Sequence, residues 1–216
     1  MEAIDQEVLF LINGANHPYF DIMMSLISGK LIWIPLYLII LYEFYCRLKF
    51  SKMLLAVLAT IGVTFLLTDF CCSHLIRPLF MRLRPVCVDN PIHTMVHAVE
   101  GYRNGASYGF PSCHASNTFG LATLVWLYFR NHWNSLAMFV WATIMCYSRV
   151  YLGVHYPGDV LCGAILGLLV GIAVYYLSRF LVRKYLHTDS QMQLQKPLTA
   201  YTVAAMFAII AIIALC

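Results

Sequence analysis

Three short segments combine arginine, histidine and carboxylate residues at spacings suited to phosphate chemistry. They cover residues 77–85, 110–116 and 148–159. The planar fork of arginine matches phosphate oxygens two at a time. Arginines converging from the three segments would therefore neutralise a bound phosphoryl group, and the candidates are Arg77, Arg84 and Arg149.

The second and third segments add groups for proton transfer and nucleophilic attack. His155 and Asp159 are four residues apart. A carboxylate bound to one ring nitrogen fixes the tautomer and makes the other nitrogen a better nucleophile or base. His114 would supply a leaving-group acid. Ser112 follows Pro111 at the start of a predicted helix, where backbone amides form an anion site.

The composition indicates a membrane protein. The chain has 216 residues, of which 61% are hydrophobic and 11% charged, and its mean hydropathy is +0.74. Soluble domains are about 45–50% apolar and about 25% charged. These values exclude a soluble globular, disordered or fibrous protein. The net charge of +4, with no basic stripe interleaved with aromatics, does not favour nucleic-acid binding.

Apolar runs predict an all-α fold that forms a single integral membrane domain over residues 1–216. A spanning helix needs about 20 residues. We expect six transmembrane helices, and residues 3–12 form a short amphipathic helix on the membrane surface. The expected spans are residues 22–46, 53–72, 112–130, 134–151, 159–180 and 199–216.

Basic residues predict the orientation. Cytoplasmic loops carry an excess of lysine and arginine. In a six-span chain, the basic residues of segments 47–52, 130 and 179–196 share one face, which we expect to be cytoplasmic. The motif arginines lie on the opposite, outer face, where membrane topology does not require them.

The three segments resemble the signature motifs of the type 2 phosphatidic acid phosphatase and vanadium haloperoxidase superfamily. That pattern is Lys-x6-Arg-Pro, Pro-Ser-Gly-His and Ser-Arg-x5-His-x3-Asp. Two positions depart from it, because arginine replaces the lysine and cysteine replaces the glycine; we expect the latter position to tolerate a small side chain. Here the motifs read Arg77-x6-Arg84-Pro85, Pro111-Ser112-Cys113-His114 and Ser148-Arg149-x5-His155-x3-Asp159.

The resemblance implies a role for each matching residue. His155 would attack phosphorus and form a phosphohistidine, Asp159 would orient it, and His114 would protonate the leaving oxygen. No metal or other cofactor is implied. The phosphoryl oxygens would be held by Arg77, Arg84, Arg149, Ser112 and backbone amides near Cys113.

The resemblance also implies a substrate class. Such membrane enzymes hydrolyse undecaprenyl diphosphate, phosphatidylglycerophosphate, phosphatidic acid or the phosphates of lipid A. The compact chain is similar to bacterial members, so we expect an inner-membrane protein with a periplasmic site. Of these, we expect undecaprenyl diphosphate or lipid A to be the substrate. Phosphate transfer between lipids and a non-catalytic transporter remain alternatives, and the oligomeric state stays open.

Two further features predict helix packing and substrate choice. Glycines recur every four residues in the fifth predicted span, which favours close helix packing; they are Gly163, Gly167 and Gly171. The loop at residues 86–111 is long and polar, and we expect it to help select the substrate.

Other polar residues admit more than one interpretation. Arg82 is interpreted as a headgroup anchor, because long basic side chains extend toward the interface. Asp69, in the second span, is either functional or paired with an arginine. A disulfide from Cys87 to Cys71 or Cys72 is a minor alternative.

Overall fold

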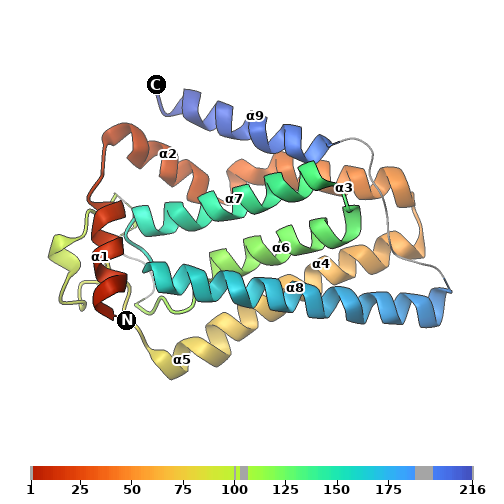
Figure 1. Ribbon diagram of the computed structural model, residues 1–216, viewed down its shortest axis with the longest axis horizontal. Coiled ribbons are helices and arrows are strands. Elements are labelled where there is room, and N and C mark those ends of the chain that lie inside the picture. The colour runs from red at the N-terminus through yellow and green to blue at the C-terminus, as the bar shows by residue number, and fades with distance from the viewer. Residues whose placement is uncertain (1, 100, 103–106, 188–196, 216) are drawn as a thin grey trace.

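A computed structural model describes residues 2–99, 101–102, 107–187 and 197–215. The long helices run side by side as a bundle, and α1 crosses one end of it (Figure 1). The described residues contain no strand. In chain order the elements are α1 (Glu2–Asn13), α2 (Pro18–Ser28), η1 (Leu31–Trp33), α3 (Ile34–Leu48), α4 (Lys52–Phe70), η2 (Cys71–Ile76), α5 (Arg77–Phe80), η3 (His93–Met95), α6 (Cys113–Phe129), α7 (His132–Tyr151), α8 (Pro157–Leu186) and α9 (Leu198–Ile213).

The first predicted span, residues 22–46, is not one helix, and that prediction is wrong. Helix α2 ends at Ser28, and Gly29 has extended backbone angles, φ −69° and ψ 140°. One 3-10 turn then leads into α3, whose first turn contains a proline. Proline fits the first turn of a helix but not its interior, so the chain starts a new helix here.

The remaining helices lie close to their predicted positions, with two extensions. Helix α4 continues through the π-helical turn η2 into α5, so the helical path ends at Phe80 rather than residue 72. Helix α8 runs to Leu186, beyond the expected end at residue 180. The π-helical turn brings Arg77 to the start of α5, and such turns are frequent at functional sites.

Helix α6 forms the centre of the bundle and packs closely against α8. A Cβ at Gly163 would lie 2.4 Å from the Ser112 carbonyl oxygen, and one at Gly167 would lie 2.2 Å from that of Ser116. These distances leave no room for a side chain. The predicted close-packing role of the α8 glycines is confirmed.

The outer faces of the bundle are apolar. Leu55 and Leu66 of α4, and Leu161 and Leu169 of α8, are each more than 60% exposed. Among the described residues, three helical stretches are long and apolar enough to cross a membrane, and α9 is a shorter apolar helix. The chain is therefore a multi-pass membrane protein. The three long stretches are Leu31–Leu48, Lys52–Phe80 and Pro157–Leu186.

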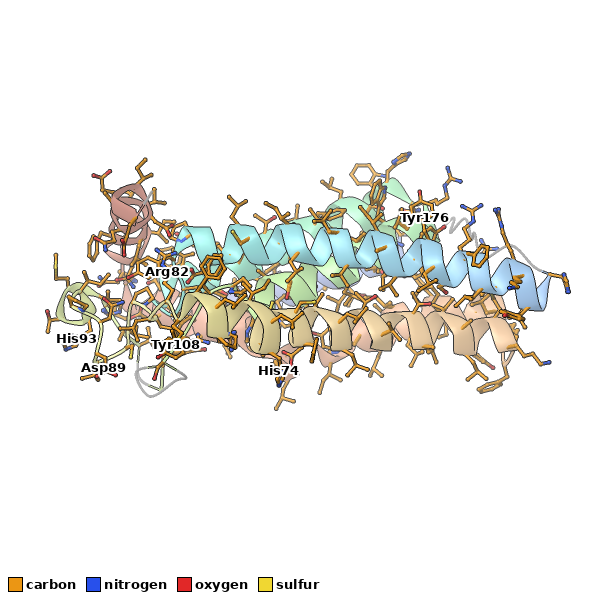
Figure 2. The ribbon with its side chains drawn as sticks, turned by 90° about the horizontal axis from the view of Figure 1, so that it is seen from below. His74, Arg82, Asp89, His93, Tyr108 and Tyr176 are labelled. Carbon is orange, nitrogen blue, oxygen red and sulfur yellow. The ribbon has the colours of Figure 1, made fainter. Side chains whose placement is uncertain are left out.

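The described motif residues gather at one end of the bundle. Figure 2 shows Arg82 and Tyr108 near α1, whereas Tyr176 lies well along α8 toward the other end. Helices α5 and α7 end here, and α6 and α8 begin here (Figure 1). Four helix termini thus bring the three segments together.

Candidate active site

His155 occupies the short turn between α7 and α8. Gly153 starts the turn with φ +68°, and a Cβ there would lie 2.5 Å from a methyl carbon of Val96. Only glycine suits this position. The turn places the His155 side chain in the interior, where the residue is 1% exposed.

Two groups face the two ring nitrogens of His155. The Nη1 atom of Arg84 lies 3.3 Å from Nε2, and the Oδ2 atom of Asp159 lies 3.4 Å from Nδ1. Arginine can only donate hydrogen bonds, so Nε2 must accept and Nδ1 must carry the proton. In this tautomer the ring lone pair is on Nε2, so Nε2 is the ring atom able to act as a nucleophile.

The contact between His155 and Asp159 is longer than a usual hydrogen bond. Within the described chain, Nδ1 has no hydrogen-bond partner of good geometry. Catalytic hydrogen bonds are often long without substrate and shorten in the complex. Gly109 lies against this pair, since a Cβ there would be 3.3 Å from both Nδ1 and the Asp159 Oδ2 atom.

Burial controls the charge of the imidazole. Burial first, and then the guanidinium groups of Arg84, Arg149 and Arg77, hold the pKa of His155 well below its usual range. A histidine in this environment is neutral at ordinary pH. The neutral form is the one that can attack phosphorus.

Asp159 is fixed from both sides. It is fully buried, and its Oδ2 atom accepts a hydrogen bond of 3.0 Å from the backbone amide of Tyr156. This contact belongs to the capping box that begins α8. The Oδ1 atom accepts from Nη1 of Arg82 at 2.9 Å. The carboxylate is thus oriented before substrate binds.

Arg82 is therefore not a headgroup anchor, and that interpretation is wrong. Its Nη2 atom binds Oδ2 of Asp5 at 2.7 Å, and its guanidinium lies 3.8 Å above the centre of the Tyr156 ring. The sequence carries no signal for this contact, because Asp5 is far away in the chain and belongs to no motif.

The predicted phosphate-binding arginines surround His155, two from the helices α5 and α7 and Arg84 from the segment after α5. Arg84 is held by the Tyr108 and Val154 carbonyl oxygens, each at 3.3 Å. Arg149, at the end of α7, donates to the Ser28 hydroxyl. Arg77, on α5, donates to the sulfur of Cys113.

The N-terminus of α6 carries the second motif. The Arg77 Nη2 atom lies 3.1 Å from the Cys113 sulfur. Cys113 is not among the residues with positive φ, so the cysteine at the family's glycine position is accommodated without strain. The Ser112 amide donates to the Asp159 carbonyl oxygen at 3.0 Å. His114 lies in the first turn of α6, within electrostatic reach of Arg149 and His155.

Several donors in this cluster have no partner among the described residues. They are the Nε atoms of Arg77 and Arg149 and the hydroxyl of Ser112, all buried. Buried donors are normally satisfied. Unpartnered buried donors of this kind are suited to binding an anion.

The structure also places cysteines, Asp69 and loop residues that the sequence left open. Cys71, Cys72 and Cys87 are free thiols, so the disulfide alternative is wrong. Asp69 lies on the exposed side of α4. In the loop at residues 86–111, the Nε2 atom of His97 lies 2.9 Å from the Oδ2 atom of Asp21. Among the described residues there is no group of three or more metal-ligating side chains.

Comparisons with known proteins agree with this arrangement. Residues 50–183 match the model of the PAP2 superfamily. The chain belongs to this superfamily. It is 41% identical over 184 residues to the lipid A 4'-phosphatase of Bacteroides thetaiotaomicron, covering 85% of this chain and 81% of that protein. It is 29% identical to a putative undecaprenyl-diphosphatase of Escherichia coli, over 78% of this chain and 80% of that protein.

A solved structure supports the fold. The transmembrane PAP2-type phosphatidylglycerolphosphate phosphatase of Bacillus subtilis aligns with a TM-score of 0.59 at 24% identity. The alignment covers 82% of this chain and 85% of that one. The bundle is therefore the PAP2 transmembrane fold.

Proposed function

We propose that this PAP2 membrane enzyme removes the 4'-phosphate of lipid A through a phosphohistidine on His155. The observation that carries the proposal is the convergence of unpartnered buried donors on a neutral histidine held beside a fixed carboxylate. The 41% identity to a lipid A 4'-phosphatase supports the substrate.

The first half of the reaction forms the phosphoenzyme. Arg77, Arg84 and Arg149 bind the phosphoryl oxygens and stabilise their charge in the transition state. The Nε2 lone pair of His155 attacks phosphorus, and the bond to the sugar oxygen breaks. His114, protonated when the phosphate anion is bound beside it, gives its proton to that oxygen. The imidazole becomes cationic, and the Asp159 carboxylate stabilises it.

The second half releases phosphate. His114, now neutral, takes a proton from water as the water oxygen attacks phosphorus. The P–N bond breaks, and its electrons return to Nε2 of His155. Acid–base assistance of this kind contributes about 10²–10⁴-fold, so we expect His114→Ala to retain a small residual rate.

The expected topology is six spans with the site at the periplasmic face of the bacterial inner membrane. Helices α3, α6 and α8 run away from the α1 end, and α4, α7 and α9 run toward it (Figure 1). Basic residues at the other end support a cytoplasmic position for it; among the described residues they include Arg47, Lys49, Lys52, Arg183 and Lys184.

Single-cysteine labelling tests this orientation. Asp89 is exposed at the α1 end (Figure 2), and Lys184 is exposed in the last turn of α8, at the other end. In a chain whose eight native cysteines are replaced, an impermeant maleimide should label Asp89→Cys in intact spheroplasts and Lys184→Cys only after lysis. The reverse pattern would contradict the orientation.

Undecaprenyl diphosphate is the second candidate substrate. It presents a phosphate at the same membrane depth, and the 29% identical relative bears that activity in its name. A lipid acceptor in place of water would turn the same phosphohistidine into a phosphotransferase.

A substrate panel separates these possibilities. The purified protein is given lipid A, undecaprenyl diphosphate, phosphatidic acid and phosphatidylglycerophosphate, each with chelator, and His155→Ala is the control. We expect phosphate release from lipid A, at the 4' position, and none from the variant. Phosphate release from undecaprenyl diphosphate alone would show that this lipid, and not lipid A, is the substrate. Wild-type activity in folded His155→Ala would overturn the mechanism.

A further inference from the structure

The guanidinium of Arg82 bridges two carboxylates from different helices. Its Nη1 atom binds Asp159 of α8 at 2.9 Å, and its Nη2 atom binds Asp5 of α1 at 2.7 Å. The Arg82 and Asp5 side chains are 24% and 14% exposed, and that of Asp159 is fully buried. Arg82 lies beside α1 (Figure 2), and the bridge leads from the partly exposed Asp5 to the buried Asp159.

Asp5 also binds the backbone at the start of α8. Its Oδ1 atom accepts a hydrogen bond of 2.7 Å from the Gly158 amide. A Cβ at Gly158 would lie 2.8 Å from the Asp5 carboxylate, so α1 packs here against bare backbone. The Tyr156 ring lies under the guanidinium at 3.8 Å. Arg82 is consequently held on three sides.

These contacts determine which oxygen of Asp159 meets His155. Arg82 takes Oδ1, and Oδ2 remains directed at Nδ1 of the imidazole. A buried carboxylate also needs a compensating cation, since an unpaired buried charge is strongly unfavourable. Arg82 supplies both the orientation and the charge.

We propose that Arg82 and Asp5 are positioning residues for the reaction: Asp5 holds Arg82, and Arg82 holds Asp159 in the orientation that activates His155. This inference rests on the proposed function. It makes α1, which carries no family motif, part of the catalytic apparatus.

A direct role of Arg82 in substrate binding is the competing explanation. A cavity of about 420 Å³ lies beside it, and its lining includes Glu2, Gln6, Asn90 and Tyr156. A residue that binds substrate through this cavity would change KM. A residue that acts through Asp159 changes kcat.

Steady-state kinetics with p-nitrophenyl phosphate test the inference, because this substrate reports on the reaction centre whichever lipid is natural. We expect Arg82→Gln to lower kcat about 10²-fold and Asp5→Asn about tenfold, with KM nearly unchanged. Arg82→Lys should recover part of kcat. Glu7→Gln is the matched control, since Glu7 is exposed on the same helix, and it should behave as wild type.

A double variant shows whether Arg82 acts through Asp159. In a protein that already carries Asp159→Asn, adding Arg82→Gln should lower kcat by less than about twofold, because the effects of residues that act as a unit are not additive. Full additivity, a change confined to KM, or wild-type kcat in Arg82→Gln would each overturn the inference.

Folding and substrate identity are controlled separately. Added guanidinium ion should partly restore kcat to Arg82→Gly, which a misfolded protein would not show; absence of rescue in a folded variant would count against the inference. Wild-type turnover of p-nitrophenyl phosphate without hydrolysis of lipid A would refute the proposed substrate and leave the test of Arg82 intact.

Discussion

Two buried carboxylates lie at opposite ends of the bundle, and their partners differ. Asp159, fully buried at the α1 end, is bound by the cation of Arg82 and faces His155. Glu43, 3% exposed near the end of α3, accepts hydrogen bonds from the neutral groups of Asn134 and Thr199. Burial is therefore common to both carboxylates, and the charge and chemistry of their partners distinguish them.

The Glu43 cluster joins helices rather than groups of a reaction centre. Asn134 belongs to α7 and Thr199 to α9, and the Asn134 side chain also accepts from the Ala200 amide at 3.1 Å. Hydrogen bonds from two helices, α7 and α9, thus meet at a carboxylate carried by a third, α3. We infer that Glu43 fixes α9 against the bundle, whereas Asp159 serves the reaction.

The largest expected effect is that of Asp159→Asn. This change keeps the shape and removes the charge that stabilises the imidazolium of His155. We expect kcat to fall about 10²–10⁴-fold. Steady-state kinetics on folded protein, judged by gel filtration and thermal melting, measure it. Unchanged kcat would remove the distinction between the two carboxylates.

Thr199→Val should affect stability and leave catalysis intact. It removes one hydrogen-bond donor from the buried Glu43 carboxylate, and the loss of a buried hydrogen bond costs about 1–3 kcal/mol. We expect a lower Tm in detergent and a kcat within about twofold of wild type. A large loss of kcat with normal Tm would mean that the Glu43 cluster reaches the site.

The catalytic end should also carry a pH dependence of stability. The folded-state pKa of His155 is lowered by burial and by Arg84, so the unfolded chain takes up a proton below about pH 6.5 that the folded chain does not. Stability should therefore fall as pH decreases from 7 to 5, by at most about 1.4 kcal/mol per pH unit for this group.

Thermal melting across this pH range checks that prediction. His155→Gln should reduce the pH dependence of Tm, and His132→Gln, at an exposed position of α7, should not. Equal slopes in all three proteins would show that His155 is not protected from protonation.

The smallest expected effect is that of Glu43→Gln. The amide keeps the size of the side chain and one acceptor oxygen, so we expect a stability loss of about 1 kcal/mol or less and no change in kcat. Compared with Asp159→Asn, it is the same chemical change at the other end of the bundle. A fall in kcat similar to that of Asp159→Asn would contradict the comparison.

The sequence predicted the parts of this molecule that depend on local signals. Helices α6 and α7 lie within three residues of their expected bounds, because apolar runs and flanking polar residues mark their ends. The motif residues at the helix termini were identifiable from spacing. The interruption at Gly29 was visible in the sequence but underestimated, since a single glycine also occurs inside helices.

Contacts between distant segments were not predictable from spacing. Asp5 and Arg82 belong to different helices, and no periodicity relates an acidic residue of α1 to the interior of α8. The tautomer of His155 likewise depends on Arg84 reaching Nε2, which requires the turn at Gly153. Such features follow from tertiary packing, which the spacing of residues along one chain does not reveal.

In the proposed mechanism, His155 carries the phosphoryl group between substrate and water. Rapid acid-free quenching of wild-type protein with lipid A labelled in its 4'-phosphate, followed by peptide mapping, tests it most directly. We expect an acid-labile, base-stable label on the peptide that contains His155, formed within the first turnover and absent in His155→Ala. Label on a different residue, or burst-free hydrolysis that persists in His155→Ala, would contradict it.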